Sequence, residues 1–279
     1  MKDITLLRHV DDLRAHIKAQ RANGHRIGLV PTMGALHEGH LSLVNEIGQK
    51  VDTVIVSIFV NPTQFAAHED LDTYPRHEAA DLEKLSTTRA SVVYAPSASD
   101  MYPSGFATSM AVAGPALGLE TDERPHFFGG VGIVVTKLLL QVLPDVAIFG
   151  EKDYQQLLVI RRIVRDLNIP VEIIGGPIIR EADGLAMSSR NAYLTRDQRA
   201  IAAHLNHILE QLAGSPHPPE EASAHARAAL LEAGFSTVDY ACIRDADTLD
   251  ALGPETTSRR ALIAARLGDV RLIDNMAAR

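Results

Sequence analysis

The sequence predicts an α/β fold, in which a doubly wound, Rossmann-like parallel sheet is followed by a smaller C-terminal α+β domain. Through the first half of the chain, short runs rich in β-branched residues alternate with amphipathic helical patterns. These runs are apolar on both faces, as strands are in a parallel sheet that is covered on both sides. After Gly175-Gly176-Pro177 the pattern changes, and two helical segments are followed by consecutive strand patterns.

The parallel sheet is predicted from strand–helix–strand alternation, which implies right-handed crossovers. The expected strands are 27–30, 53–60, 91–95, 146–149 and 171–174. The helices expected between them are 40–50, 79–86, 132–143 and 153–168. The last helix is the clearest, because it places Leu157, Ile160, Val164 and Leu167 at steps of three and four on one apolar face.

The smaller domain is predicted from about residue 179 onward. Apolar residues at helical spacing from Ile201 to Leu212 mark one helix, and a second one over 219–233 follows a surface loop. Strands are expected at 237–243, 260–267 and 270–273, with a tight turn at Gly268-Asp269 between the last two. We therefore expect two domains, 1–178 and 179–279.

Composition and charge exclude several classes of protein. Of the 279 residues, 46% are hydrophobic and 22% charged, as in globular proteins, and the formal net charge is −8 at pH 7. Nucleic acids and anionic membranes demand a positive face, so neither is expected as a partner. The one cysteine, Cys242, cannot form an intramolecular disulfide and suits a reducing compartment.

The apolar segments predict neither a secretion signal nor a membrane span. The first residues include acidic side chains at positions 3, 11 and 12, and their apolar run is too short for a signal peptide. The longest candidate span, 131–143, is interrupted by Thr136, Lys137 and Gln141 and falls short of the ~18 residues needed. We expect a cytoplasmic protein.

Three polar segments directly follow predicted strands, and ligands bind at the carboxyl ends of strands in such sheets. The first is PTMGALHEGH at 31–40. Gly34 and Gly39 let the backbone approach a ligand, and the helix that begins there offers unpaired N–H groups to an anion. His37 and His40 are three apart and could point at the same group. The same residues also fit a plain turn followed by a helix with solvated histidines.

A zinc-protease interpretation of this segment is disfavoured. Zinc sites of the His-Glu-x-x-His type need histidines four apart on a continuous helix. Here the spacing is three and Gly39 intervenes. We expect no metal held by protein side chains.

The second and third segments contain groups suited to a substrate and to phosphate. NPTQF at 61–65 begins with a turn signal, but Gln64 is placed to bind a hydroxyl or carboxylate. GEKDYQQ at 150–156 contains Lys152, which can neutralise phosphate oxygens. Asp153 in the same segment can accept hydrogen bonds from ribose hydroxyls or cap the following helix.

Two further segments are less specific. MSSRN at 187–191 combines two hydroxyls with a guanidinium, which suits an anion, although serine-rich loops are common. The glycines of GGVGI at 129–133 do not match a dinucleotide-binding motif, and we expect them to permit close packing at a helix start.

Together these segments resemble a known family. PTMGALHEGH, with its His-x-Gly-His core, resembles the nucleotide-binding motif of the HIGH superfamily of nucleotidylyl transferases and class I tRNA synthetases, and MSSRN resembles its second, mobile phosphate-binding motif. With IFVNPTQF, YPR at 74–76, FGEKDYQQL and MSSRNAYL, the chain is similar to the pantothenate synthetase (pantoate–β-alanine ligase) family over nearly its whole length. One departure is Gly129, where many members have an arginine, so no role of that arginine is carried over.

The resemblance implies ATP-dependent ligation of pantoate and β-alanine to pantothenate, a step in coenzyme A biosynthesis. In that reaction the pantoate carboxylate attacks the α-phosphorus of ATP to give pantoyl adenylate and pyrophosphate, and the β-alanine amine then displaces AMP. ATP, with Mg²⁺ on its phosphates, would be a substrate, and no organic cofactor is implied. The likeness also suggests a homodimer.

The resemblance further assigns residues to each part of the reaction. The catalytic groups that meet charge on the phosphates would be His37, His40, Lys152, Ser188, Ser189 and Arg190. The adenosine would be surrounded by Met33, Gly34, Gly39, Gly150, Asp153, Ile179 and Met187. Pantoate and β-alanine would be bound by Asn61, Gln64 and Gln156. Segment 66–76 and the loop around Met187 are expected to act as lids, and no dedicated base for the amine is evident.

Other functions stay open at this point. A nucleotidylyl transferase acting on a different carboxylate or phosphate acceptor would share the His-x-Gly-His loop, but a phosphorylated acceptor needs a basic pocket. Gln64 and Gln156 instead favour an acceptor with carboxylate and hydroxyl groups. A tRNA synthetase-like protein is disfavoured by the net charge and by the lack of an anticodon-binding extension. A nucleotide sensor would have no reason for the two glutamines.

Overall fold

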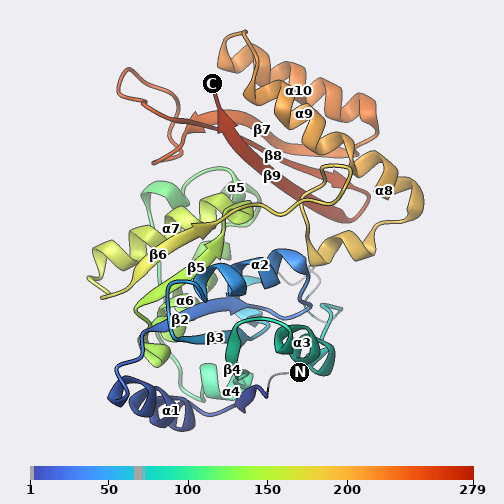
Figure 1. The fold of residues 1–279 in the computed structure, drawn as a ribbon. Helices are drawn as coiled ribbons and strands as arrows, with labels where there is room; N and C mark the ends of the chain where they lie inside the picture. Colours follow the sequence, from blue (N-terminus) through green and yellow to red (C-terminus); the bar gives the residue numbers. More distant parts are fainter. Residues whose placement is uncertain (1–2, 66–70, 72) are drawn as a thin grey trace.

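The computed structural model describes residues 3–65, 71 and 73–279. Within this part of the chain, six strands form one parallel sheet. Their order is β1 (Thr5–Leu7), β4 (Ala90–Tyr94), β3 (Thr53–Ile58), β2 (Ile27–Thr32), β5 (Val146–Gly150) and β6 (Glu172–Gly176). From β2 the chain builds β3 and β4 on one side, and it later adds β5 and β6 on the other side. The order reverses between the neighbours β2 and β5, so the predicted doubly wound sheet is confirmed (Figure 1).

Helices cover both faces of this sheet. On one face lie α2 (Glu38–Ile47) and α3 (Glu78–Ser86), and on the other α1 (Val10–Ala22), α6 (Phe127–Val142) and α7 (Tyr154–Asp166). Leu29 and Val30 are adjacent in β2 and both have no exposed surface, yet they belong to the two opposite apolar clusters. A strand between two helical layers must be apolar on both sides, which explains its uninterrupted hydrophobic sequence. Two short helices, α4 (Ala98–Met101) and α5 (Glu120–Glu123), lie in the connection between β4 and α6.

The C-terminal part of the chain forms a separate antiparallel sheet, drawn in the upper part of Figure 1. It consists of β7 (Thr237–Asp245), β8 (Arg259–Leu267) and β9 (Val270–Ala278), in that order. With α9 (His204–Ala213) and α10 (Pro219–Ala233) it encloses its own apolar cluster, and α8 (Arg196–Ala202) precedes them. The predicted turn at Gly268-Asp269 is confirmed by the pairing of Leu267 with Val270. We propose that the two sheets with their helices are the two domains expected from the sequence.

A small apolar contact joins the two sheets. Leu119 and Leu158 from the first part pack against Leu249 and Leu262 from the second. All four are buried. The space that opens beside this contact is therefore walled by both parts of the chain.

Several elements differ from the sequence prediction. Strand β1 and helix α1 were not predicted, because β1 is only three residues long and α1 buries only Leu13 and Ile17. The helix predicted from Ile201 to Leu212 is two helices, α8 and α9, which meet at Ala203. Strand β9 was predicted to stop at residue 273 but continues to Ala278, since the polar pair that follows, 274–275, hides the strand pattern.

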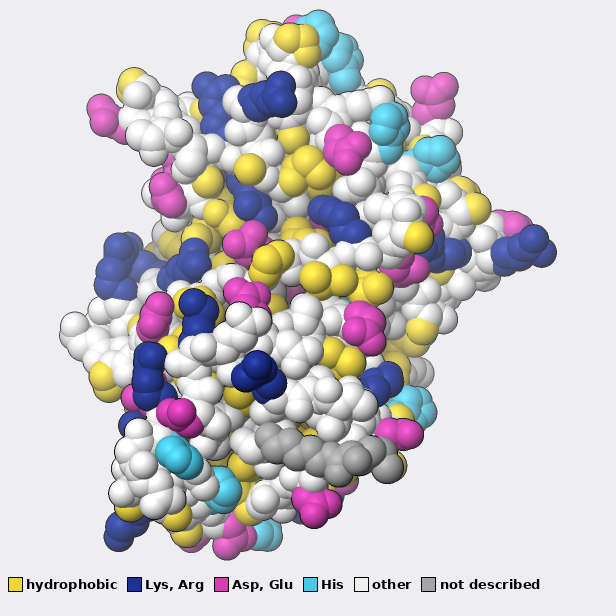
Figure 2. All heavy atoms as spheres, viewed as in Figure 1, with side chains coloured by type: hydrophobic (Ala, Val, Ile, Leu, Met, Phe, Trp, Pro, Cys, Tyr) yellow, Lys and Arg dark blue, Asp and Glu magenta, His cyan; other side chains and the backbone are white. Residues whose placement is uncertain are grey.

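The surface of the described residues gives two further observations. None of the helices in that part of the chain combines the length and the hydrophobicity that crossing a bilayer requires. On the face shown in Figure 2, Lys and Arg side chains are interspersed with Asp and Glu side chains.

The glycines at the start of α6 allow a backbone-to-backbone contact, as the sequence predicted. A Cβ added at Gly130 would lie 2.3 Å from the carbonyl oxygen of Thr63. Thr63 belongs to a 3₁₀ turn, Pro62–Gln64, that follows β3. The absence of a side chain at Gly130 thus lets α6 set the position of that turn.

We expect Gly130→Ala to destabilise the protein by about 1–3 kcal/mol, because overpacking here meets backbone atoms that cannot rotate away. Urea denaturation measures the change. The control is Gly253→Ala, since a Cβ at Gly253 meets nothing within 4 Å, and there we expect a change within about 0.5 kcal/mol. Equal effects of the two substitutions would contradict the packing argument.

Candidate active site

A cavity of about 1010 Å³ opens at the carboxyl ends of β2, β3, β5 and β6. Residues of both sheets line it, including Leu262 and Ile273 from the C-terminal sheet. Its position coincides with the reversal of strand order between β2 and β5, where ligands bind in open α/β sheets. The volume is large enough for more than one small ligand, since typical ligand pockets occupy about 300–1,000 Å³.

The structure brings nearly all of the sequence-predicted site residues into this one cavity. The predicted residues that line it are Met33, His37, Gly39, His40, Asn61, Gln64, Gly150, Lys152, Asp153, Gln156, Ile179, Met187, Ser188, Ser189 and Arg190. Gly34 is not among the lining residues. Its φ of +83° instead allows the turn that follows β2, and a Cβ there would lie 3.1 Å from a carboxylate oxygen of Asp81.

The two histidines bind each other and the start of α2. His37 is the N-cap residue, and its Nδ1 accepts a hydrogen bond from the N–H of Gly39 at 3.2 Å. In return, Nδ1 of His40 accepts from the N–H of His37 at 3.3 Å. The imidazole centroids are 4.1 Å apart. A capping box thus fixes both rings, with histidines in the places usually held by a hydroxyl and a carboxylate residue.

These bonds also determine which ring nitrogens are protonated. Burial, aided by the positive charge of Lys152, lowers the pKa of His37 to about 4. Burial, then His37 and Lys152, lowers the pKa of His40 to about 3. Both rings are therefore neutral near pH 7, and because each Nδ1 accepts a hydrogen bond, each Nε2 carries the proton. The pair offers two fixed N–H donors without carrying charge.

Gly39 is needed for this arrangement. A Cβ at position 39 would lie 2.9 Å from Cε1 of His37, and 3.8 Å from Cβ of Met187 on the opposite loop. The glycine therefore leaves room for the ring of His37 and for the approach of the loop that begins at Met187.

Two residues of α3 that the sequence reasoning did not single out hold the histidine loop in place. The carboxylate of Asp81, which is 2% exposed, accepts from the N–H groups of Ala35 and Leu36 at 2.9 and 2.8 Å. The ammonium of Lys84 donates to the carbonyl of Leu36 at 2.6 Å. In the sequence both residues resemble ordinary charged positions of an amphipathic helix, so only the fold reveals their role.

Asn61 is saturated by contacts with the protein. Its amide nitrogen donates to Oε1 of Gln64 and to the carbonyl of Gly130, both at 3.2 Å. Its oxygen accepts from the hydroxyls of Thr63 and Tyr102 at 3.0 and 2.8 Å. Asn61 lines the cavity, but its polar atoms orient Gln64 and the 3₁₀ turn.

Gln155 and Gln156, adjacent in the sequence, have different surroundings. Gln156 lines the cavity, as predicted. The buried side chain of Gln155 donates to the carbonyls of Pro115 and Gly118 and accepts from the N–H of Glu120 at 3.1 Å. Gln155 thereby fixes the loop that leads to α5.

A network of charges forms the wall of the cavity near Gln64. The buried carboxylate of Glu120 pairs with Arg271 at 2.8 Å and accepts from the hydroxyl of Tyr240 at 2.7 Å. Burial, followed by the nearby Glu120, raises the pKa of Tyr240 well above its usual value. Arg124, one helical turn after Glu120, donates to the carbonyl of Gln64 at 3.1 Å. Residues of the C-terminal sheet are thus linked to the loop that carries Gln64.

Lys152 and Asp153 lie on a 3₁₀ turn, Glu151–Asp153, between β5 and α7. Asp153 occupies the N-cap position of α7, but within the described residues its side chain makes no cap hydrogen bond. Of the two roles considered from the sequence, helix capping is therefore not the one seen. Its exposed carboxylate lines the cavity beside Lys152.

A group of potential metal ligands lies away from this site. Within the part of the chain that the structure describes, the ligand atoms of His217, Glu221 and His225 lie within 4.8 Å of one another. These residues are exposed and do not line the cavity.

The MSSRN segment closes the cavity from the other side. Its Ser188 hydroxyl accepts from the N–H of Arg190 at 3.2 Å and so caps a 3₁₀ turn, Ser189–Tyr193. Because a hydroxyl can accept and donate at once, the Ser188 proton can still be directed at a ligand.

The two segments predicted to act as lids contact each other where both are described. The hydroxyls of Tyr74 and Ser189 are 3.3 Å apart, and the hydroxyl of Tyr193 donates to the carbonyl of Thr73 at 3.4 Å. Residues 66–70 and 72 of the first segment lie outside the described residues. Lid motion stays a prediction.

The cavity therefore combines two chemical environments. One side has neutral imidazole N–H groups, an ammonium, a guanidinium and hydroxyls, which together suit a polyphosphate. The other side has Gln64 and Gln156, uncharged groups that can bind hydroxyls and a carboxylate. Such a cavity can hold a nucleotide beside a small hydroxy acid.

Several known proteins are similar to this chain over almost its whole length. The family model described as pantoate-beta-alanine ligase matches residues 5–277. A pantothenate synthetase from Caulobacter vibrioides is 53% identical over 278 residues, which cover 98% of each chain. One from Mesorhizobium japonicum is 53% identical over 268 residues, covering 95% of this chain and 94% of the relative.

Two solved structures are similar over almost the whole chain. The crystal structure of pantothenate synthetase from Thermus thermophilus has a TM-score of 0.87 and 42% identity, and covers 98% of this chain and 99% of its own. The crystal structure of pantoate-beta-alanine ligase from Francisella tularensis, complexed with "Beta-gamma ATP" and β-alanine, has a TM-score of 0.83 and 33% identity. It covers 99% of this chain and 98% of its own.

The histidine geometry predicts an unusual titration. We expect the rings of His37 and His40 to stay neutral down to about pH 5, since their pKa values lie at about 4 and about 3. NMR titration of the histidine Cε1–H resonances measures this directly. The control is the urea-unfolded protein, whose imidazoles titrate near the usual ~6.5. A midpoint near that value for His37 or His40 would contradict the capping geometry.

The same lowered pKa values predict a loss of stability in acid. As the pH falls below about 6.5, imidazoles of the unfolded chain take up protons that the folded chain does not accept. The contribution of the pair is therefore complete above that pH and is lost as the pH falls through the folded values, about 4 for His37 and about 3 for His40. Urea denaturation across this range should show a smaller loss for a His37→Gln/His40→Gln variant than for the unsubstituted protein.

Proposed function

The chain belongs to the pantoate–β-alanine ligase family and is an ATP-dependent ligase that forms a C–N bond between pantoate and β-alanine, and we propose that it does so in the cavity at the carboxyl edge of its parallel sheet. The observation that supports this site is the convergence there of His37, His40 and Lys152 with Gln64 and Gln156. These residues belong to segments that follow three different strands, β2, β3 and β5.

The first step makes pantoyl adenylate. A carboxylate is a poor acyl electrophile, so its oxygen attacks the α-phosphorus of ATP and pyrophosphate leaves. Negative charge grows on the transferred phosphate and on the leaving group, and fixed donors stabilise that charge. His37 and His40 supply neutral Nε2–H donors, and Lys152 supplies the positive charge. Ser188, Ser189 and Arg190 complete the cradle from the opposite loop.

Mg²⁺ on the nucleotide fits this cavity. The ion prefers oxygen ligands, and in nucleotide sites it takes one or two carboxylates together with phosphate oxygens. The uncapped Asp153 carboxylate beside Lys152 could supply such an oxygen, or could accept from the ribose hydroxyls. When bound, the ion would neutralise part of the charge on the phosphates.

Pantoate is held by the amide side of the cavity. Gln64 is 8% exposed, its side chain is fixed by Asn61 and by a contact with Met33, and its backbone carbonyl is fixed by Arg124. Gln156 faces the same cavity from α7. Asn61 acts here as a positioning residue for Gln64.

The second step requires the neutral amine of β-alanine to attack the activated carbonyl and release AMP. An alkyl ammonium titrates near ~10, so only a small fraction is neutral at pH 7. Positioning of the amine against the adenylate therefore carries much of this step, and orientation can contribute about 7–11 kcal/mol in favourable systems. The proposed product is pantothenate, used for coenzyme A. A homodimer in the cytoplasm also belongs to the proposal, on family likeness.

The competing function is a nucleotidylyl transferase that acts on a different carboxylate or phosphate acceptor. Both functions use the histidine loop, and they differ in the acceptor side of the cavity. A phosphorylated acceptor would need cations near Gln64. There the guanidinium of Arg271 is paired with Glu120 and Asp239, and that of Arg124 is paired with Glu120, which favours the uncharged acceptor site of a ligase.

The decisive assay is isotope exchange between pyrophosphate and ATP. We expect pantoate to start the exchange without β-alanine, because adenylation precedes amide formation, and AMP to accumulate only when β-alanine is added. Exchange that ignores pantoate would reject the assignment. Exchange that responds to another carboxylic acid and not to pantoate would favour the competing function.

His40→Ala and Lys152→Ala should each lower kcat by about a hundredfold or more, since each removes a donor to the developing charge. The controls are His207→Ala and Lys18→Ala, which are exposed on α9 and α1, and we expect near-normal rates for both. Circular dichroism confirms folding. Turnover near that of the unsubstituted enzyme in either test variant would remove that residue from the site.

A further inference from the structure

Two neighbouring residues of β9 line the cavity and contact the two phosphate-facing loops. Asp274 and Asn275 are polar, yet each is only 2% exposed. One contacts the segment that leads into Ser188–Arg190, and the other contacts the turn that carries Lys152. Neither residue was singled out from the sequence.

Asp274 anchors Arg180. The carboxylate of Asp274 accepts from both terminal nitrogens of the guanidinium, at 2.6 and 3.0 Å. Arg180 also donates to the carbonyl of Gly184 at 3.0 Å. A two-point ion pair of this kind fixes orientation as well as distance.

Arg180 in turn fixes the base of the serine loop. Residues Arg180 and Ala186 form an antiparallel bridge, and the N–H of Met187 donates to the carbonyl of Ile179 at 2.9 Å. The segment 179–187 is therefore a closed hairpin, and Ser188 follows its last hydrogen bond directly. The position of Arg180 thus determines where the serine loop begins.

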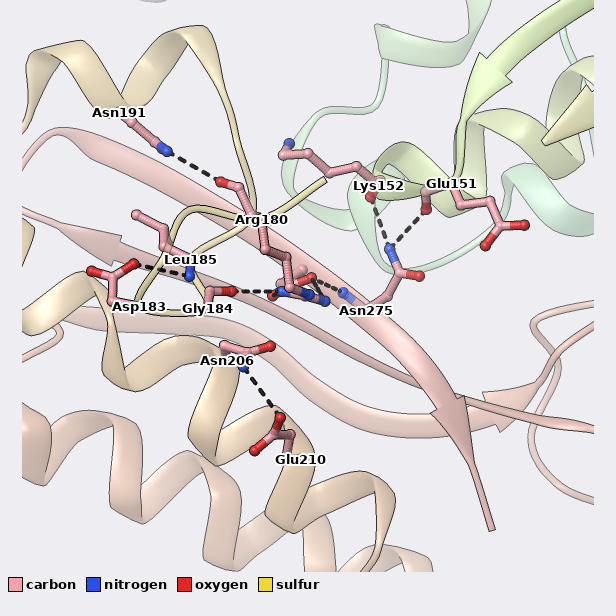
Figure 3. A network of polar contacts seen from close by, with 12 residues as sticks. Glu151, Lys152, Arg180, Asp183, Gly184, Leu185, Asn191, Asn206, Glu210 and Asn275 are labelled. Carbon is pink, nitrogen blue, oxygen red and sulfur yellow. Dashed lines mark hydrogen bonds and ion pairs between the residues drawn. The ribbon is translucent and has the colours of Figure 1, made fainter. Parts of the chain in front are cut away.

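Asn275 anchors the lysine turn. Its amide nitrogen donates to the carbonyls of Glu151 and Lys152, at 3.0 and 2.9 Å. Its amide oxygen accepts from Nε of Arg260 on β8 at 2.7 Å. Figure 3 shows the Asn275 amide pointing at the two carbonyls, while the Lys152 side chain extends away from them. The amide nitrogen thus holds the backbone of Lys152, and the amide oxygen fixes the orientation of the amide itself.

Strand geometry explains why two successive residues can serve two loops. Adjacent side chains of a strand point to opposite faces. Asp274 and Asn275 are opposite Ile263 and Leu262 in the register with β8. Backbone pairing with β8 holds β9 in place from Val270 to Ala278. Both loops are therefore positioned relative to the same strand.

We propose that Asp274 and Asn275 are positioning residues of the ligase, which set the location of Lys152 relative to Ser188, Ser189 and Arg190 across the cavity. This inference rests on the proposed function, because it assumes that both loops bind the same polyphosphate. Neither residue needs to touch the nucleotide. Their effect reaches it through backbone carbonyls on one side and through the Arg180 hairpin on the other.

The first test substitutes the two anchors separately. Asn275→Ala removes both donors to the lysine turn, and Asp274→Asn replaces the carboxylate by a group of the same shape. A displacement of about 1 Å can cost on the order of a hundredfold, so we expect kcat of pantoate-dependent ATP–pyrophosphate exchange to fall about 10- to 100-fold. KM for pantoate should change less than about threefold, because Asn61 and Arg124 hold Gln64 independently.

The second test asks whether each anchor acts through its loop. In a Lys152→Ala background, Asn275→Ala should lower the rate by no more than about twofold further, and Asp274→Asn should behave likewise in an Arg190→Ala background. The control is Gln211→Ala on α9, whose exposed amide lies 2.9 Å from Nε2 of His207, and we expect its rate to equal that of each parent. Where Asp274→Asn does not fold, Arg180→Gln removes the same ion pair from its more exposed side.

The outcomes separate this inference from the proposed function. If the rate losses of an anchor variant and of its loop variant multiply in the double variant, the anchor substitution acts through general damage to the fold. That result would overturn the inference. So would near-normal kcat in both anchor variants. If the unsubstituted protein shows no pantoate-dependent exchange, the proposed function itself fails, and this inference, which rests on it, is overturned with it; normal exchange in the unsubstituted protein with either result above would overturn the inference alone.

Discussion

The reversal of strand order between β2 and β5 is the constraint on which the site depends. The crossovers from these two neighbours run in opposite directions along the sheet, so the carboxyl ends of both strands are left uncovered by their own helices. The histidine loop continues from β2 and the lysine turn from β5, and parallel pairing of Gly28 with Val146 sets the two strands in register. Residues more than a hundred positions apart, such as His40 and Lys152, therefore reach the same cavity.

Buried polar contacts fix the loops that the parallel sheet brings together around the cavity. Asp81 holds the histidine loop, Gln155 fixes the loop before α5, and Glu120 joins that loop to the C-terminal sheet through Arg271 and Tyr240. In each case a buried charge or amide is satisfied by specific partners, as burial demands. A misplaced loop would leave these groups unpaired, so the network favours one arrangement of the cavity walls over its alternatives.

The sequence predicted the central strands and the loops that follow them, because strands buried on both faces have uninterrupted apolar runs and the site residues gather where those runs end. It could not predict β1, which is too short to show a pattern, or the last part of β9. There the polar residues Asp274 and Asn275 resemble the end of a strand, although both are buried. Asp81 was missed for a related reason. A charged residue on a helix looks solvated until the fold shows backbone N–H groups directed at it. The division at residue 178 and the chemical role of each site residue stay predictions.

The locked tautomers of His37 and His40 have a consequence for inhibitor chemistry. Each Nδ1 is already used by the backbone, so the remaining ring nitrogen, Nε2, can only donate hydrogen bonds. A compound aimed at this corner needs acceptor atoms there, such as a sulfonyl or a phosphonate oxygen. An amine or amide N–H in the same place would face another N–H and lose its hydration without compensation. Mimics of the triphosphate that replace acceptors with donors are therefore poor starting points for this enzyme.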